Sequence, residues 1–283
     1  MDTMMTLGAA AWRDPTVASS ILRGIWFTLS ATALASLVLP PLHALSLHGR
    51  FANTASSWQV WKGYFGVFYL IGWLWNGLVL LCAWHPPTAL SPFLPPHLST
   101  INGSTLLVLL VLQCHLFRRM MESWAMTDFG ASTMHASACL LGVGHYVLVS
   151  LSVVLDPAAS ARDDETSYFG YMLAGVGLFL YASAHQMRCN GLLTNLKRTN
   201  QGAYGLPFGD WFDHTWSPLY LAEILIYASF VLVTSGRNVN VVALASWVTV
   251  NQAISAARAA AWYQATFPAA KTLHRATLVP RLW

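Results

Sequence analysis

The stretch HQMRCNGLLTNLKRTNQGAYGLPFGDWFDHTWSPLYLAE, residues 185–223, decides the fold because it is a polar insert between two long apolar runs. The runs are Phe169–Met187 before it and Ser217–Ser235 after it. Each run is about as long as a helix that crosses the hydrocarbon core of a bilayer. The insert ends on Glu223, which enters the second run. This pattern predicts two membrane-spanning helices that are joined by a polar segment at one membrane face.

The rest of the chain has the same character, since 55% of its 283 residues are hydrophobic and only 9% are charged. Soluble domains carry about 25% charged residues. The apolar runs are Ala18–Leu39, Tyr64–Trp84, Ser104–Trp124, Met134–Leu155, Phe169–Met187, Ser217–Ser235 and Val239–Ala257. We therefore expect an all-α, polytopic membrane protein of about seven transmembrane helices, forming one integral-membrane domain over residues 1–283. We also expect the first run to be kept, because no signal-peptide pattern accompanies it.

The basic residues indicate the orientation in the membrane. Most Lys and Arg residues fall in segments on the same side as the C-terminus, which predicts a cytosolic C-terminus and a cytosolic polar insert. The net charge of +4 is spread over these juxtamembrane segments. This distribution favours contact with anionic lipid or a phosphorylated cofactor, and we expect no nucleic-acid partner.

Ionisable side chains inside apolar runs are costly and are candidates for function. His115, Arg118, Arg119 and Glu122 have i, i+3, i+4 and i+7 spacing, which places them on one face of a helix. This face has two interpretations: a juxtamembrane anchor with an Arg118–Glu122 pair, or an anion-binding stripe that points into the bundle. Glu223 follows a helix start near Pro218. It has two interpretations: a carboxylate inside the span that needs a partner or a polar cavity, or a hydrated carboxylate near the headgroups.

Other motifs narrow the kind of site. The ten histidines and four cysteines show no metal-ligand spacing, so we expect no metal. The chain also lacks a Gly-x-Gly-x-x-Gly motif after a strand, a Walker loop and a Gly-x-Ser-x-Gly elbow. His185 closes the fifth run, where a lone histidine is more often a satisfied core residue than a ligand. A cofactor would therefore be held by the helices and by the polar insert.

Several fragments together resemble one family. SAHQMRCNGLLTNLK, LPFGDWF, SPLYLAE, NQAISA and HRATLVPRLW are similar to the C-terminal half of the steroid 5α-reductase family, and most similar to its polyprenol reductase branch. Upstream, HLFRRMMES and YFGVFYLIGWLWNG resemble the same branch. The resemblance covers roughly residues 61–283.

The resemblance implies a multi-pass enzyme of the endoplasmic reticulum membrane that holds NADPH under the cytosolic insert. It implies a long-chain isoprenoid substrate taken from the bilayer, whose α-isoprene double bond, in polyprenal or polyprenol, is reduced to give the dolichol precursor for protein N-glycosylation. By matching positions, the implied cofactor-binding residues are Arg118, Arg119, His185, Asn195, Lys197, Tyr204, Asp210, Glu223, Tyr263 and Arg275.

The chemistry of the family reaction favours the aldehyde as substrate. A hydride added to the β-carbon of an α,β-unsaturated carbonyl group puts negative charge on the oxygen, which needs a proton or a hydrogen-bond donor. An allylic alcohol offers no such electron sink. For the donor we predict Tyr64, which aligns roughly with the substrate-polarising carboxylate of the steroid-reducing branch, and His115 as second choice.

The chain also departs from the family pattern. Relatives commonly carry Asn at the position of Leu219, Arg at the position of Gly205, and a functional His near Ala259–Ala261. Three other readings of the sequence therefore stay open. They are a 3-oxo-Δ4-steroid 5α-reductase, a membrane methyltransferase with a related bundle, and a non-enzymatic lipid-binding or transport bundle.

Overall fold

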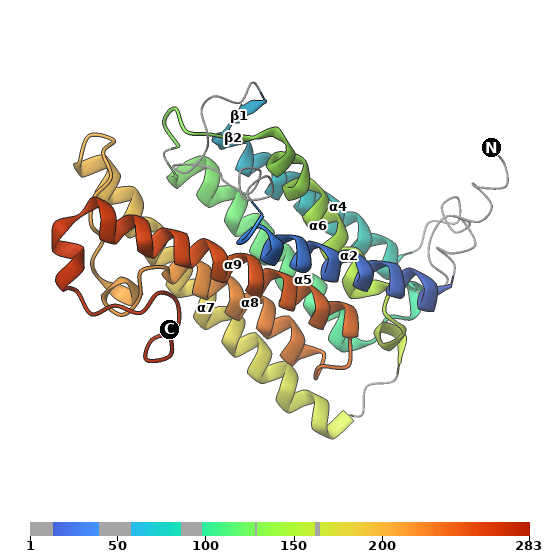
Figure 1. Ribbon diagram of the computed structural model, residues 1–283. Helices are drawn as coiled ribbons and strands as arrows, with labels where there is room; N and C mark the ends of the chain where they lie inside the picture. The colour runs from blue at the N-terminus through green and yellow to red at the C-terminus, as the bar shows by residue number, and fades with distance from the viewer. Residues whose placement is uncertain (1–13, 40–57, 86–97, 128, 162–164) are drawn as a thin grey trace.

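The computed structural model describes residues 14–39, 58–85, 98–127, 129–161 and 165–283, and these residues form a bundle of helices (Figure 1). The seven α-helices in these ranges are α2 (Pro15–Ala35), α4 (Phe65–Trp84), α5 (Gly103–Met121), α6 (Ala136–Val154), α7 (Glu165–Thr199), α8 (Pro218–Val233) and α9 (Val239–Thr266). Each overlaps one of the predicted apolar runs, so the all-α prediction is confirmed.

Five of these helical segments are long and apolar enough to cross a membrane: Pro15–Ala35, Lys62–Trp84, Gly103–Met126, Ala136–Val154 and Val239–Thr266. Helix α8 is apolar but has 16 residues, and α7 has 35 residues with a polar C-terminal part. Successive helices run in opposite directions (Figure 1). The protein is therefore a multi-pass membrane protein, in which α7 extends well past the apolar run that predicted it.

Local sequence signals set several helix ends. The Asp14 side chain accepts hydrogen bonds from the backbone N–H groups of Thr16 and Val17, and Pro15 fills the first turn of α2. Asn102 caps α5 in the same way. At its other end α5 passes into a π-helical turn, η4 (Glu122–Met126). Such turns are frequent at functional sites because they redirect side chains.

Helices α7 and α8 pack closely because Gly175 has no side chain. A Cβ atom at Gly175 would lie 2.5 Å from Val233 Cγ2 and 2.9 Å from the backbone oxygen of Ser229. At Gly177, two residues along the same helix, a Cβ atom would meet nothing within 4 Å. Small residues at such positions let two membrane helices approach each other.

Gly175→Ala is therefore expected to destabilise the bundle, by about 1–3 kcal/mol, because the added methyl group overpacks the contact with α8. Gly177→Ala is the matched control, since it gives the same gain in helix propensity without the clash. Thermal unfolding in detergent measures both. Equal melting temperatures for the two variants would contradict the close α7–α8 contact.

Short elements complete the fold. A two-stranded antiparallel ribbon pairs β1 (Gln59–Trp61) with β2 (Thr133–His135), with Val60 opposite Met134. The 3₁₀ turns are η2 (Lys62–Tyr64), η3 (Leu98–Thr100), η5 (Pro157–Ser160), η6 (Asp210–Asp213) and η7 (Pro268–Thr272). The ribbon, the α7–α8 connection and the C-terminal segment lie at the same end of the bundle (Figure 1). We call this the loop end.

The apolar core has two parts. The larger part lies between the helices and includes Trp26, Leu112, Val153, Phe230 and Leu244. The smaller part lies at the loop end and contains Trp216, Ala260, Tyr263 and Ala270. The second cluster fixes the polar insert and the C-terminal segment against the end of α9.

Candidate active site

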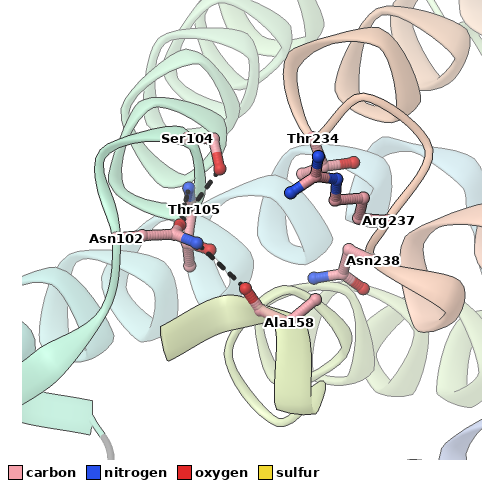
Figure 2. A pocket seen from close by; sticks show the side chains of 7 residues that line it. All are labelled: Asn102, Ser104, Thr105, Ala158, Thr234, Arg237 and Asn238. Carbon is pink, nitrogen blue, oxygen red and sulfur yellow. Dashed lines mark hydrogen bonds between the residues drawn. The ribbon is translucent and has the colours of Figure 1, made fainter. Parts of the chain in front are cut away.

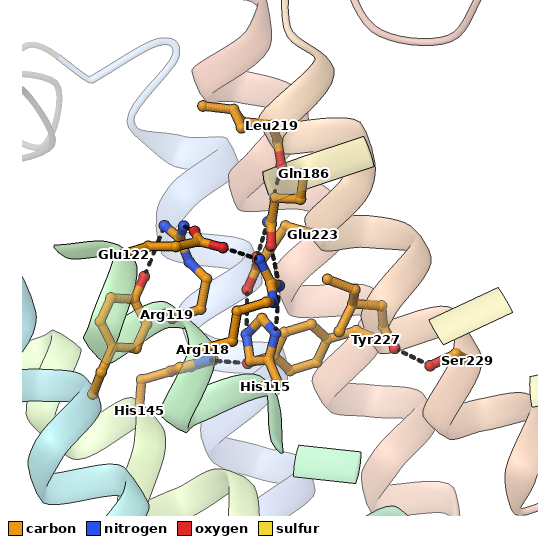
Figure 3. A network of polar contacts seen from close by, with 12 residues as sticks. His115, Arg118, Arg119, Glu122, His145, Gln186, Leu219, Glu223, Tyr227 and Ser229 are labelled. Carbon is orange, nitrogen blue, oxygen red and sulfur yellow. Dashed lines mark hydrogen bonds and ion pairs between the residues drawn. The ribbon is translucent and has the colours of Figure 1, made fainter. Parts of the chain in front are cut away.

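Polar side chains of four helices meet near the loop end in a network that we call the inner cluster (Figure 3). It contains Tyr69 of α4; His115, Arg118 and Arg119 of α5; Glu122 of η4; Gln186 and Asn190 of α7; and Glu223 of α8. The polar face predicted for α5 therefore points into the bundle. Arg118 and Glu122 do form the ion pair that a juxtamembrane anchor would have, but this pair lies within the network inside the bundle.

Glu122 holds both arginines. Arg118 donates to its Oε1 atom at 2.6 Å, and Arg119 donates to its Oε2 atom. Asn190 lies 3.4 Å from the same Oε2 atom. The Glu122 side chain is only 3% exposed, so its charge is compensated by these donors and not by water.

Gln186 connects the arginines to the second carboxylate. Its Oε1 atom accepts from Arg118 at 2.5 Å, and its Nε2 atom donates to Glu223 Oε2 at 2.6 Å. An amide can serve a cation and an anion at once because it carries both an acceptor and a donor. Gln186 thus orients Glu223, which is 14% exposed, toward the centre of the bundle.

His115 is fully buried between Arg118 and Glu223. Its Nδ1 atom lies 3.3 Å from Arg118 Nη2, and its Nε2 atom lies 3.5 Å from Glu223 Oε1, out of line for a hydrogen bond. A guanidinium can only donate, so Nδ1 is the acceptor and we assign the proton to Nε2. Both nitrogens of His115 are therefore directed at charged neighbours.

A tight turn of the polar insert covers the outer part of α7. Gly209 and Asp210 have positive φ angles of 93° and 48°, a region that favours glycine. Asp210 is held there because its Oδ1 atom accepts from Trp211 N at 2.7 Å and lies 2.6 Å from His185 Nδ1. The Trp211 ring stacks on the His185 ring at 4.5 Å. This turn ties the insert to α7.

The same turn lies over Cys189, which is fully buried. Its Sγ atom donates to Asp210 Oδ1 at 3.8 Å, and burial, followed by the nearby carboxylate, raises the pKa of the Cys189 thiol to about 12. A thiol of this kind is inert to alkylation at neutral pH.

Asp210→Ala is expected to increase maleimide labelling of Cys189 at pH 7.5 about tenfold or more, because the turn loses its anchor and the thiol becomes accessible. Peptide mass analysis resolves Cys189 from the other three cysteines. Asp14→Asn, at an exposed cap far from the turn, is the control. Unchanged labelling in Asp210→Ala would show that Asp210 does not hold the turn over Cys189.

Aromatic rings surround Arg275 in the C-terminal segment. Arg275 donates to the backbone oxygen of Pro207 at 2.8 Å and lies over the rings of Phe208 and Trp216, at 4.6 and 4.8 Å. The Tyr263 ring stacks on the Trp216 ring, with the ring centroids 5.7 Å apart. Burial lowers the pKa of Arg275. These contacts join the C-terminal segment to the polar insert.

The remaining predicted site residues lie further out. Asn195 and Tyr204 are exposed, and the Tyr204 ring meets Trp262 at 5.3 Å. Lys197 lies in the last turn of α7, with its ammonium group beside Gly130. Tyr64 ends η2 and is 47% exposed, with its ring next to Trp61. The structure therefore brings His115, Arg118, Arg119 and Glu223 together and places Tyr64 outside the inner cluster.

Three members of the inner cluster were not predicted from the sequence: Tyr69, Gln186 and Asn190. Gln186 follows His185 directly, and consecutive helical residues point in different directions, so His185 contacts the insert whereas Gln186 contacts the cluster. Tyr69 accepts from Arg119 Nη2 at 3.2 Å, but it lies within an apolar run where nothing in the pattern distinguishes it. The AHQ fragment was the available signal for Gln186.

A small polar pocket lies at the opposite end of α5. It is lined by Asn102, Ser104, Thr105, Ala158, Thr234, Arg237 and Asn238 (Figure 2). Asn102 precedes α5 whereas Arg118 and Arg119 lie in its last turn, so the length of the helix separates this pocket from the inner cluster. The pocket has no contact with the predicted site residues.

Comparisons with known proteins agree with the sequence resemblance. The family model described as 3-oxo-5-alpha-steroid 4-dehydrogenase matches residues 133–283, more than half of the chain. A polyprenal reductase of Homo sapiens is 29% identical over 93% of this chain and 96% of its own length. Polyprenal reductases of Rattus norvegicus (29% identical, 93% and 96%) and Danio rerio (27% identical, 80% and 81%) are similar in the same way.

Proposed function

Because the chain belongs to the 3-oxo-5-alpha-steroid 4-dehydrogenase family, we propose that it is a membrane-embedded reductase that acts on polyprenal. The relatives that align over nearly the whole chain carry that name, which supports the isoprenoid aldehyde over a steroid. The observation that carries the proposal is the inner cluster. It concentrates charged and hydrogen-bonding groups between apolar helices, where such groups are costly and mark candidate binding or catalytic sites.

The residues at the loop end fit a pyridine dinucleotide. The Nε atoms of Arg118 and Arg119 are buried without a hydrogen-bond partner, so the cluster has unused donors. Gln186 and Glu223 present a carbonyl, an amide and a carboxylate side by side, which suits a carboxamide group. The cofactor is a nicotinamide nucleotide in this proposal, and we infer NADPH because several basic residues surround the same end.

The roles follow from chemistry and position. Glu223 accepts from the carboxamide, and Arg118 and Arg119 neutralise nearby negative charge. Arg275 and Lys197 at the loop end attract the phosphates, and Asp210 with His185 fixes the cover. Asn195, Tyr204 and Tyr263 complete the outer wall. When bound, the cofactor supplies a hydride, while the protein supplies orientation and exclusion of water.

The substrate must be an aldehyde for this site to work. Reduction of the α,β double bond adds one hydride at the β-carbon and one proton, and the carbonyl group carries the charge between the two events. A polyprenol has no carbonyl group at this position, so we propose that polyprenal is the direct substrate and that a separate dehydrogenase handles the alcohol.

Tyr64 and His115 stand as the two predicted proton donors. His115 is held between Arg118 and Glu223, which supports a role in positioning Glu223. Tyr64 is exposed beside the β1–β2 ribbon, and its role stays a prediction that the turnover of Tyr64→Phe tests.

The multi-pass fold and the distribution of basic residues support a proposal for the cellular setting. We propose an endoplasmic reticulum enzyme with the loop end and C-terminus in the cytosol, where the cofactor is available. The isoprenoid tail stays in the bilayer between helices while its aldehyde reaches the inner cluster. The product then serves as a dolichol precursor for protein N-glycosylation.

The test is turnover by the purified full-length protein with NADPH, offering a polyprenal and a 3-oxo-Δ4-steroid in parallel. We expect NADPH oxidation with the polyprenal and a product two hydrogens heavier. Faster reduction of the steroid would favour the steroid reductase. Stabilisation by S-adenosylmethionine instead of NADPH would favour a methyltransferase. Binding or flux of lipid without NADPH oxidation would favour a non-enzymatic bundle.

A further inference from the structure

A second polar pair lies deeper in the bundle than the inner cluster. Tyr227 is four residues after Glu223, so it lies on the same face of α8, one turn further from the loop end. Its hydroxyl oxygen is 2.9 Å from His145 Nε2 of α6 (Figure 3). Tyr227 is 1% exposed, and both side chains lie within electrostatic range of the Glu223 carboxylate. The proposed binding of cofactor and substrate assigns no role to Tyr227 or His145.

The reaction requires a proton, and most of the inner cluster is unable to give one. Glu122 and Glu223 act as acceptors toward Arg118, Arg119 and Gln186, which is the behaviour of ionised carboxylates. Arginine does not lose its proton in proteins. His115 has its remaining N–H on Nε2, 3.5 Å from Glu223 Oε1, and loss of this proton would leave an imidazolate beside a carboxylate. The tyrosine hydroxyls and His145 are left as donors.

On this basis we propose that Tyr227 is the proton donor of the reductase and that His145 positions it and restores its proton. The inference rests on the proposed reduction of polyprenal. Hydride addition to the β-carbon leaves an enolate, and the Tyr227 O–H bond breaks as its proton passes to the α-carbon, which gives the saturated aldehyde. The tyrosinate then takes the Nε2 proton of His145 while Nδ1 of the same ring takes a proton from water, so the imidazole stays neutral.

His145 suits this role because of its surroundings. With Nε2 protonated, it donates to the Tyr227 oxygen and leaves the Tyr227 proton free for the substrate. The ring is fixed by edge contacts with Trp26 at 5.6 Å and Tyr146 at 5.1 Å. His145 is half-buried in the structure, and the proposal requires that one water molecule reaches its Nδ1 atom in each turnover.

Tyr69 is the competing donor, and its contacts are different. Its hydroxyl group accepts from Arg119, and Arg119 also lies over its ring at 5.3 Å. A tyrosinate there would be stabilised by the guanidinium, but a guanidinium does not give up a proton to restore the tyrosine. Tyr227 has an imidazole at hydrogen-bond distance, so it can donate in every cycle.

The experiment compares Tyr227→Phe, Tyr69→Phe and the exposed control Tyr171→Phe in the full-length protein with NADPH and polyprenal. We expect kcat of Tyr227→Phe to fall about 100- to 1000-fold, which lies within the range for loss of a general acid. KM for NADPH should stay within about twofold, and Tyr171→Phe should match the wild type. Thermal unfolding with and without NADPH checks that each variant is folded and binds the cofactor.

His145→Gln separates proton transfer from support. Glutamine keeps an N–H donor for Tyr227 but does not relay a proton. We therefore expect the kcat of His145→Gln to stay at least about tenfold below that of the wild type. If His145 has a purely structural role, His145→Gln should instead regain the activity that His145→Ala loses. If the wild type reduces polyprenal and Tyr227→Phe keeps half of its kcat, or Tyr69→Phe alone loses activity, the assignment of Tyr227 is overturned. If the wild type shows no reduction, the proposed function fails and this inference fails with it.

Discussion

Glu223→Gln is expected to raise KM for NADPH about 100-fold. Glu223 Oε2 accepts one hydrogen bond, from Gln186 Nε2 at 2.6 Å, and Glu223 Oε1 lies 3.5 Å from His115 Nε2. Hydrogen bonds to a charged group contribute about 1.5–3 kcal/mol, and 2.8 kcal/mol corresponds to about two orders of magnitude in affinity. The substitution keeps the shape of the residue 223 side chain but replaces one acceptor oxygen with an N–H donor. Glu122 is then the one carboxylate left in the inner cluster to balance Arg118 and Arg119.

The measurement is the initial rate against NADPH concentration at saturating polyprenal, supported by the thermal shift that NADPH produces. Asp14→Asn removes a carboxylate from an exposed helix cap far from the cluster, and it should leave KM unchanged. A Glu223→Gln protein with KM within twofold of the wild type would remove Glu223 from the cofactor site.

Glu122→Ala is expected to cost about 3–5 kcal/mol in the free energy of unfolding, because both arginines of α5 would lose their shared anion while buried. The Arg118 and Arg119 side chains are 18% and 20% exposed, so water replaces the carboxylate poorly. Unfolding of the protein in mixed micelles with increasing denaturing detergent gives the difference.

A triple variant with Met at residues 118, 119 and 122 separates stability from function. Replacing a whole buried ion cluster with apolar side chains of similar volume is often neutral or stabilising. We therefore expect this variant to regain most of the stability lost in Glu122→Ala and to bind no NADPH. If Glu122→Ala unfolds like the wild type, the two arginines are not held by this carboxylate.

The sequence predicted the helices well because each apolar run is long enough to be recognised by itself. The spacing of His115, Arg118, Arg119 and Glu122 also predicted a shared face, since this is a local property of one helix. The β1–β2 ribbon was not predicted, because three-residue strands are too short to show an alternating pattern.

The partners of that face were harder to predict because they come from distant parts of the chain. Gln186 reaches Arg118 across 68 residues of sequence, and Tyr227 reaches His145 across 82. Such contacts depend on how α6, α7 and α8 pack, and packing against Gly175 brings α7 and α8 together. Periodicity describes one helix at a time and says nothing about these pairs.

The structure shows where the residues that depart from the family pattern lie. Ala259 and Ala260 are both buried, and Ala260 belongs to the apolar cluster of Trp216, Tyr263 and Ala270. The position where relatives carry a functional histidine is thus part of a packed core in this chain. Leu219 still contributes its backbone oxygen, which lies 3.5 Å from Gln186 Nε2.

The most direct test of the central claim is the origin of the two hydrogens that the substrate gains. The purified protein is incubated with polyprenal and NADPH that carries deuterium at both C4 positions, in ordinary water, and the product aldehyde is analysed by mass. We expect one deuterium at the β-carbon and one hydrogen from solvent or protein at the α-carbon. A product without deuterium, or unchanged polyprenal beside a protein that binds NADPH, would contradict it.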